Sequence, residues 1–394
     1  MSNSMYEKLG VDPTKSSVKE IFHAIIDNEY PGAFVNIITD PFCPERVLTQ
    51  HQDGDGSKFV QRVLHYFENN DPAVFAGMVD DALSMNTGDI AASGFVAGPI
   101  LVTNVLNLNF PKEIKKIIMK VIALRMLELK EIYRGHGFDL RLLGGETADL
   151  PDQVRTGVFD IAVTAWANRS QLIKGNVESG DLIFGFPSDE QAAWETKSNS
   201  GIMSNGLTLA RSSLMHSSYN KTYGHLKRGG DYYNGKFFYN DCSVPLGMSV
   251  GDALISPTRQ WAIVIKEIIS ALEKEDALFM LHGISMNTGG GATKISNIGQ
   301  GNILYIKNMP PPPPLFRLIQ CESNESWENM YQILNCGIGI DVVGKNHPVF
   351  KDALKEAALK CDLPLYQLGV CEKMPREPKN NQVLLSTPFG EFRY

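Results

Sequence analysis

The spacing of apolar side chains predicts alternating helices and strands in the first half of the chain. Apolar residues recur every three or four positions over 16–28 and 112–133, which is the period of an amphipathic helix. Three runs rich in β-branched and aliphatic residues, 98–107, 140–147 and 158–167, are typical of strands. This alternation favours an α/β or α+β fold.

The pattern weakens between the two halves of the chain, over 168–181, and a second α/β run begins with the apolar segment 181–187. We therefore expect an N-terminal α/β domain over 1–172 and a C-terminal α/β domain over 173–394. Within the second half, 216–250 is rich in Gly, Tyr, Asn and Ser and is interpreted as a long surface excursion. Five prolines at 310–314 must be extended, and a stiff connector is favoured over a ligand motif.

Length and composition agree with this organisation and exclude several classes of protein. A chain of 394 residues with 43% hydrophobic residues can form two cores, and a net charge of −7 argues against a nucleic-acid surface. The 6 cysteines show no CxxC spacing, so we expect reduced thiols. No signal peptide or membrane span is recognisable, and we expect a cytoplasmic protein.

Three acidic positions in the first half are candidates for chemistry. QDGDGSK (52–58) sets Asp53, Asp55 and Lys58 among glycines, within the segment 50–59 that we interpret as a polar loop. Glycines allow backbone amides to approach an anion, and carboxylates can hold a divalent ion, although a solvated turn gives the same pattern. Asp89 follows Thr87 and Gly88, where the helical pattern of 75–94 fails. Glu146 follows an apolar strand that we expect to end in a turn at Gly144 and Gly145.

Two turns in the second half could donate hydrogen bonds to a ligand. Ser204 and Asn205 lie in a glycine-bounded turn ahead of a predicted helix. Thr288 precedes the triple glycine Gly289–Gly291, which marks close backbone approach to a ligand or a flexible loop. Cys336, in LNCGIGID (334–341), is interpreted as a small buried residue rather than a nucleophile.

The order of these motifs is more specific than any one of them. DGDGSK, GGETADLP, SGIMSNG, SPTR, TGGG and LNCGIGI follow one another between Asp53 and Asp341. In this order they resemble the aminoimidazole ribonucleotide synthetase (phosphoribosylformylglycinamidine cyclo-ligase) family. The resemblance implies that the N-terminal sheet completes a barrel across a homodimer and that the C-terminal domain closes over a small-molecule substrate. It also implies ATP and Mg²⁺ as cofactors, leaves a K⁺ requirement open, and implies neither a nucleic-acid nor a membrane partner.

The resemblance assigns roles to residues of this sequence. It implies that Asp53, Asp89 and Lys58 are catalytic and that Asp53, Asp89 and Glu146 bind metal. The remaining implied site residues fall into a phosphate-binding group and a substrate-binding group. They are Gly54, Gly56, Lys58, Gly144, Gly145, Glu146 and Thr147 for ATP phosphates, and Ser204, Asn205, Gly289, Gly290, Gly291 and Asn335 for the substrate.

The chain departs from the family pattern within these motifs. Asp55 and Ser57 replace Val and Thr, and Gly88 replaces Asn. Two histidines of the family cleft become Met203 and Met286, which we expect to lie near one another.

The resemblance implies that formylglycinamidine ribonucleotide and ATP give aminoimidazole ribonucleotide, ADP and phosphate. Two alternatives stay open at this stage. One is a related ATP-dependent enzyme with another substrate, and the other is a nucleotide-binding scaffold without catalysis.

Overall fold

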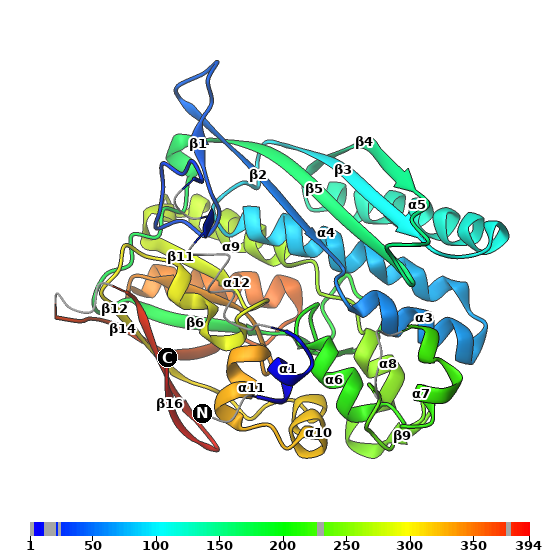
Figure 1. Cartoon of the computed structure of the whole chain (residues 1–394). Helices are drawn as coiled ribbons and strands as arrows, with labels where there is room; N and C mark the ends of the chain where they lie inside the picture. The colour runs from blue at the N-terminus through cyan, green and yellow to red at the C-terminus, as the bar shows by residue number, and fades with distance from the viewer. Residues whose placement is uncertain (1–3, 12–20, 23–24, 227–231, 376–379) are drawn as a thin grey trace.

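The computed structural model describes all residues except 1–3, 12–20, 23–24, 227–231 and 376–379. Most of the helix predicted over 16–28 therefore lies outside the described residues. The described chain forms two mixed β-sheets with helices between and around them (Figure 1), and the α/β expectation is confirmed. None of the helices it describes is long and apolar enough to cross a membrane.

The first sheet has five strands in the order β1-β2-β5-β3-β4, and only β3 and β4 run parallel. Its strands confirm the three predicted ones. The elements of this half are α1 (Met5–Lys8), β1 (Ile38–Thr39), β2 (Arg46–Gly54), α3 (Lys58–Asn69), α4 (Ala76–Ala91), β3 (Pro99–Leu108), α5 (Lys112–Gly135), β4 (Asp139–Ala148) and β5 (Gly157–Asn168).

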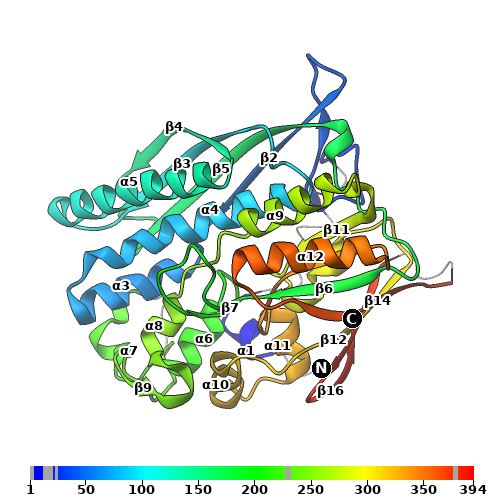
Figure 2. The ribbon, with the colours of Figure 1, turned by 180° about the vertical axis from the view of Figure 1, so that it is seen from behind.

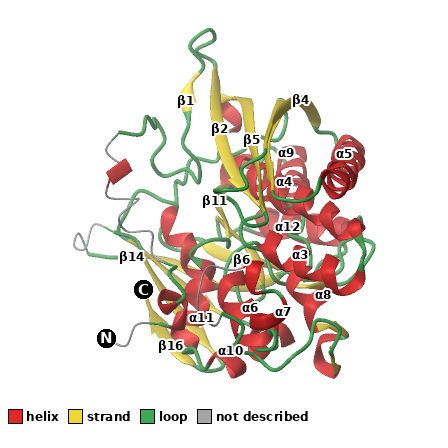
Figure 3. Ribbon diagram, turned by 45° about the vertical axis from the view of Figure 1, so that its right-hand side comes forward, coloured by secondary structure: helices red, strands yellow, loops and turns green. Residues whose placement is uncertain are grey.

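One face of this sheet is closed by helices and the other is not. Alternate residues of β5, from Phe159 to Ala167, are buried in the same core as α4 and α5, while the residues between them are partly exposed. Figure 3 shows α4, α5 and α9 on one side of strands β2, β5 and β4.

The second sheet has seven strands in the order β11-β13-β6-β14-β12-β15-β16, antiparallel except for β12 beside β15. The predicted boundary at 172 and 173 falls between the last strand of the first sheet and the first strand of the second. The strands of this half are β6 (Leu182–Pro187), β7 (Asp189–Glu190), β8 (Asn199–Ser200), β9 (Cys242–Ser243), β10 (Met248–Ser249), β11 (Leu281–Met286), β12 (Ile303–Asn308), β13 (Ile338–Gly344), β14 (Tyr366–Lys373), β15 (Gln382–Thr387) and β16 (Gly390–Arg393). Its helices are α6 (Leu207–Leu214), α7 (Tyr219–Thr222), α8 (Val250–Ile255), α9 (Trp261–Lys274), α10 (Pro314–Ser323), α11 (Trp327–Ile333) and α12 (Pro348–Cys361).

A shared layer of helices joins the two sheets. Figures 1 and 2 show α4, α9 and α12 side by side between them, and α9 contacts both of its neighbours. Buried residues of all three helices belong to one hydrophobic cluster. The layer therefore fixes the position of the first sheet relative to the second.

Three local predictions from the sequence are wrong. Gln50–Gly54 belongs to β2 rather than to a loop, and the glycines of GGET continue β4 rather than ending it. Helix α4 runs through Gly88 to Ala91, so Asp89 lies in its last turn and not in a loop. The Thr87 hydroxyl donates to the Leu83 carbonyl at 2.7 Å, which keeps this polar residue compatible with a buried helix.

The described residues of 216–250 include several that are buried, in contrast to the surface excursion predicted from the sequence. Tyr219, Tyr233 and Tyr239 are buried in the second hydrophobic cluster, beside α6 and α8. Of the five prolines, Pro314 begins α10, where a missing N–H costs no hydrogen bond.

Candidate active site

A cavity of about 700 Å³ lies where turns from distant parts of the chain meet. The β2–α3 turn contributes Asp53, Gly54 and Gly56, and the turn ahead of α6 contributes Ser204 and Asn205. The connection after β11 contributes a third group, and the N-terminal and C-terminal segments complete the wall. These further lining residues include Tyr6, Thr288, Gly289, Gly290, Lys294, Ile333, Asn381 and Tyr394.

The β2–α3 turn depends on its glycines. A side chain at Gly54 would meet the Asp160 carboxylate at 1.9 Å, and Gly56 has φ +59. The Asp53 carboxylate accepts a hydrogen bond from the Gly54 N–H at 2.8 Å. The turn thus presents backbone and carboxylate together at the cavity wall.

The alternation of β2 points His51 and Asp53 toward α4, where they meet Asn86 and Asp89. His51 Nδ1 lies 3.0 Å from the Asn86 amide oxygen, and His51 Nε2 lies 3.4 Å from Asp89 Oδ2. The Asn86 amide nitrogen also donates to the Asp53 carbonyl at 2.9 Å. A helix and a strand therefore hold two carboxylates and an imidazole together.

The two carboxylates differ in their electrostatic surroundings. Burial raises the pKa of Asp53, and the charge of Asp89 raises it further. Burial also raises the pKa of Asp89, but Lys294 and His51 outweigh this effect and hold the pKa below its usual value. Asp89 Oδ1 is buried and has no hydrogen-bond partner among the described residues.

Lys294 is the cation that the structure brings to this site. It lies in a 3-10 helix, Gly291–Asn297, with its ammonium 3.7 Å from Asp89 Oδ2. The ammonium also donates to the Thr288 hydroxyl and lies 4.8 Å from the centre of the Phe34 ring.

Lys58, the cation predicted from the sequence, lies elsewhere. Its fully buried ammonium donates to Asp81 of α4 at 2.9 Å and to the Ser256 carbonyl. Arg62 and Thr258 also bond to Asp81. These partners account for Lys58 as part of a structural ion-pair network, away from the cavity wall.

Glu146 and its neighbours Gly144, Gly145 and Thr147 also lie outside the cavity, exposed on the edge strand β4. Strand pairing places Gly54, Asp160, Val105 and Glu146 in one row across the sheet. Three strand spacings separate the ends of this row, about 14 Å. Glu146 shares the face of Val105 and Asp160, which is opposite to the face of Asp53. In one chain, therefore, Glu146 does not join Asp53 and Asp89.

Asn335 and Gly291 support the cavity from behind, and Asn205 lines it. The Asn335 amide donates to Ser188 Oγ at 2.6 Å and to the Gly201 carbonyl at 3.1 Å, which fixes the turn that carries Ser204. Gly291 is buried, and a side chain there would meet the Leu334 and Tyr331 carbonyls at 2.5 Å. The Asn205 amide donates to the Ile333 carbonyl, and its oxygen is buried without a partner in the described chain.

Gly88 and Met286, two positions at which the chain departs from the family pattern, are in contact. A side chain at Gly88 would lie 2.1 Å from the sulfur of Met286, so the two residues pack directly against each other. Met203 and Met286 are both buried in the large hydrophobic cluster, and neither lines the cavity.

His51 was not predicted as a site residue from the sequence. Its position two residues before Asp53 places it on the same face of the strand once 46–54 is known to be a strand.

Comparisons with known proteins identify relatives of the chain. No model of a known protein family matches it. Among named proteins, the phosphoribosylformylglycinamidine cyclo-ligase of Methanococcus vannielii is 29% identical over 81% of this chain and 76% of its own length. The enzyme of Brevibacillus brevis is 26% identical over 85% of this chain and 84% of its own length. The enzyme of Pyrococcus furiosus is 30% identical over 67% of this chain and 64% of its own length. These similarities confirm the resemblance and the prediction of an enzyme of the ligase kind.

Solved structures with the same fold are more distant in sequence. The HypE–HypF complex matches with a TM-score of 0.51 and 13% identity over 95% of this chain and 96% of the other. AaThiL complexed with AMPPCP and TMP matches with a TM-score of 0.51 and 10% identity over 97% and 96%. Phosphoribosylformylglycinamidine synthase II from Thermotoga maritima matches with a TM-score of 0.50 and 12% identity over 98% of this chain and 49% of that one.

The contrast between the two lysines is testable by chemical denaturation. Lys58→Met should lower the free energy of unfolding by about 3 kcal/mol, because it removes one partner of a buried carboxylate. Lys294→Met should lower it by less than about 1 kcal/mol, since its pair with Asp89 borders the cavity. Lys115→Met, on the surface of α5, is the matched control. Equal losses for the first two variants would contradict the assignment of Lys58 to the fold.

Proposed function

Because the chain is a relative of the phosphoribosylformylglycinamidine cyclo-ligases, we propose that it cyclises formylglycinamidine ribonucleotide to aminoimidazole ribonucleotide with ATP, releasing ADP and phosphate. The observation that carries this proposal is the cavity at which Asp53, Ser204 and Gly289 meet. These residues come from the motifs that resemble the family. Its volume, about 700 Å³, suits small-molecule substrates.

The walls of the cavity supply groups that suit a nucleotide phosphate chain. Its three glycine-containing turns can offer backbone N–H groups to anionic oxygens. Lys294 supplies the positive charge that the sequence reasoning gave to Lys58. Support also comes from similar folds, since HypE has been solved in complex with ATP and AaThiL with AMPPCP.

Asp53 and Asp89 fit a magnesium site. Asp53 lines the cavity, Asp89 lies beside the lining residue Lys294, and Asp89 Oδ1 is a buried acceptor that lacks a partner in the described chain. Mg²⁺ prefers oxygen ligands of this kind. When bound, the ion would neutralise phosphate charge and align the transferred phosphoryl group.

In the proposed reaction the formyl amide oxygen of the substrate attacks the γ-phosphorus of ATP, and ADP departs. The amidine nitrogen then attacks the activated carbon, the ring closes, and phosphate leaves with the former amide oxygen. Neither step requires a covalent bond to the protein. The protein's part is to orient the two substrates, which the Ser204–Gly206 and Thr288–Gly290 turns do by fixed backbone geometry.

The open face of the first sheet fits the proposed homodimer. Val105 and Val158 are 37% and 39% exposed there, and Leu143 on the edge strand is 59% exposed. A second copy packed face to face would bury these residues and complete a barrel. It would also bring Glu146 of each chain close to the dimer interface rather than leaving it in solvent.

The reaction is tested directly with the purified chain, ATP, Mg²⁺ and formylglycinamidine ribonucleotide. ADP and aminoimidazole ribonucleotide should form in equal amounts, as measured by chromatography with mass detection. ADP without the aminoimidazole product would indicate a related enzyme with another substrate. No turnover would indicate a nucleotide-binding scaffold.

The magnesium assignment predicts the behaviour of two conservative variants. Asp53→Asn and Asp89→Asn should each lower turnover about tenfold or more and raise the Mg²⁺ concentration needed, because each removes a ligand charge. Turnover is measured against Mg²⁺ beside the melting temperature, with the exposed Asp152→Asn as control. If both variants keep native turnover and native magnesium dependence, the two carboxylates do not share the ion.

The dimer is tested by light scattering. The native chain should have twice the 43.6 kDa mass of one copy at micromolar concentration. Val105→Asp with Val158→Asp should give a monomer, since two charges would be placed in the proposed interface. Leu124→Asp, at a 52% exposed position on α5, should stay dimeric. A native monomer, or dissociation by the α5 variant alone, would refute this interface.

A further inference from the structure

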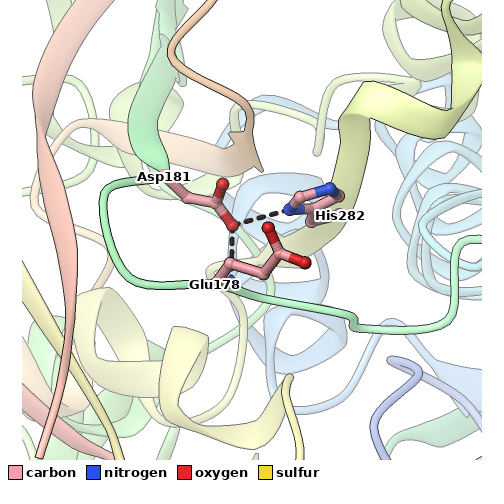
Figure 4. Close-up of side chains that lie close together, drawn as sticks. All are labelled: Glu178, Asp181 and His282. Carbon is pink, nitrogen blue, oxygen red and sulfur yellow. Dashed lines mark hydrogen bonds and ion pairs between the residues drawn. The ribbon is translucent and has the colours of Figure 1, made fainter.

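Three side chains of metal-ligating type converge away from the cavity, at the starts of β6 and β11 (Figure 4). Glu178 and Asp181 lie in the segment that enters β6, and His282 is the second residue of β11. A ligand atom from each residue lies within 4.8 Å of the other two. Asp181 and His282 are buried and Glu178 is exposed, so the group is formed inside the protein but reaches solvent on one side.

The backbone directs the two carboxylates to the same place. The Asp181 N–H donates to the Glu178 carbonyl at 3.3 Å, and the Glu178 N–H donates to Asp181 Oδ2 at 2.7 Å. Gly180 between them has φ +91, a conformation that glycine adopts without strain. Asp181 Oδ2 also lies 2.7 Å from His282 Nδ1. This turn and the first residues of β11 therefore preform a cluster with two oxygen ligands and one nitrogen ligand.

Of the three side chains, the Glu178 carboxylate provides the argument for a bound ion. Figure 4 shows it turned toward His282 and Asp181, and within the described residues it makes no hydrogen bond or ion pair. Two carboxylates at this spacing repel each other unless a positive charge, either a protonated imidazole or a metal ion, lies beside them. An exposed side chain could rotate into water to avoid that repulsion. Its position beside Asp181 indicates a place for a cation.

We propose that Glu178, Asp181 and His282 bind one divalent transition-metal ion of the Zn²⁺ type, with water completing its coordination. Carboxylate oxygen and imidazole nitrogen both bind Zn²⁺ at about 2.0–2.2 Å. The mixed nitrogen and oxygen set favours such an ion over Mg²⁺ or Ca²⁺, which take oxygen ligands. His282 binds through Nδ1 as the neutral tautomer that carries its proton on Nε2, and a small rotation of the exposed Glu178 side chain closes the site.

The ion would join the segment between the two sheets to β11. From His282 to Met286 the strand spans about 13 Å, and it then leads into Thr288 and Lys294 at the cavity. The proposed metal is therefore separate from the Asp53 and Asp89 pair. Its effect is to fix β11, and with it the approach of the triple-glycine turn to the cavity.

The experiment uses the full chain after treatment with a chelator. Zn²⁺ is titrated in by calorimetry, and the metal retained after gel filtration is counted by mass spectrometry. One Zn²⁺ per chain should bind and raise the melting temperature. Glu178→Gln and His282→Asn should each weaken binding by about tenfold or more. Glu372→Gln, an exposed glutamate on β14, and Asp53→Asn in the cavity should bind Zn²⁺ as the native chain does.

Each outcome decides for or against the site. No Zn²⁺ binding by the native chain at micromolar concentration would overturn the proposal. So would binding that persists in both Glu178→Gln and His282→Asn, or binding that Asp53→Asn removes. Because Glu178 is exposed, its variant should fold even if the buried His282→Asn does not. The readout is bound metal rather than ADP, so it is independent of the proposed reaction.

Discussion

The position of the cavity depends on the buried carboxylate of Asp81. It accepts hydrogen bonds from the Thr258 N–H at 2.7 Å, from the Thr258 hydroxyl at 2.6 Å and from Lys58 at 2.9 Å, and it pairs with Arg62. Burial raises the pKa of Asp81, but the two cations outweigh this effect and keep the pKa low. A charge in this environment is stable only with such partners, so α3, α4 and the 256–259 segment are held in one arrangement. Ser204 lies 3.3 Å from the Thr258 hydroxyl, which extends this arrangement to the cavity wall.

Apolar packing fixes the C-terminal end of α4, about two turns beyond Asp81. Gly88 of α4 lies against Met286, and Trp261 of α9 lies so close to Gly339 that a side chain there would meet its ring at 1.8 Å. The contact brings β11 and β13 against the helical layer without any polar group. Met203 and Met286 are both buried in the large hydrophobic cluster, where they contribute to close packing. The imidazole near the carboxylates comes from His51 of β2.

The sequence allowed good predictions where structure is local. The long helix α5 and strands β3 and β5 follow from their apolar periodicity, and the turn before α6 follows from its glycines. The predictions at 50–54 and at Gly88 were wrong for a shared reason. His51 and Asp53 of β2 face the site and not a core, and Gly88 allows close contact with Met286, almost two hundred positions later. The pattern of residues along the chain does not indicate such non-local partners. For the same reason, the motif around Lys58 does not predict its contacts with Asp81 and the Ser256 carbonyl.

The unequal surroundings of Asp53 and Asp89 suggest how an acidic protein, with a net charge of −7, can accept a nucleotide. Asp89 already has Lys294 and His51 beside it, whereas burial and the charge of Asp89 act together to raise the pKa of Asp53. Asp53 is therefore the carboxylate with less compensating positive charge in the free protein, because His51 and Lys294 lower its pKa by less than burial and Asp89 raise it. A magnesium ion arriving with ATP would supply that charge to Asp53, while Lys294 would stay available to the phosphates. In the proposed reaction the metal and the nucleotide would therefore bind together, because each would remove an electrostatic cost that the other would meet alone.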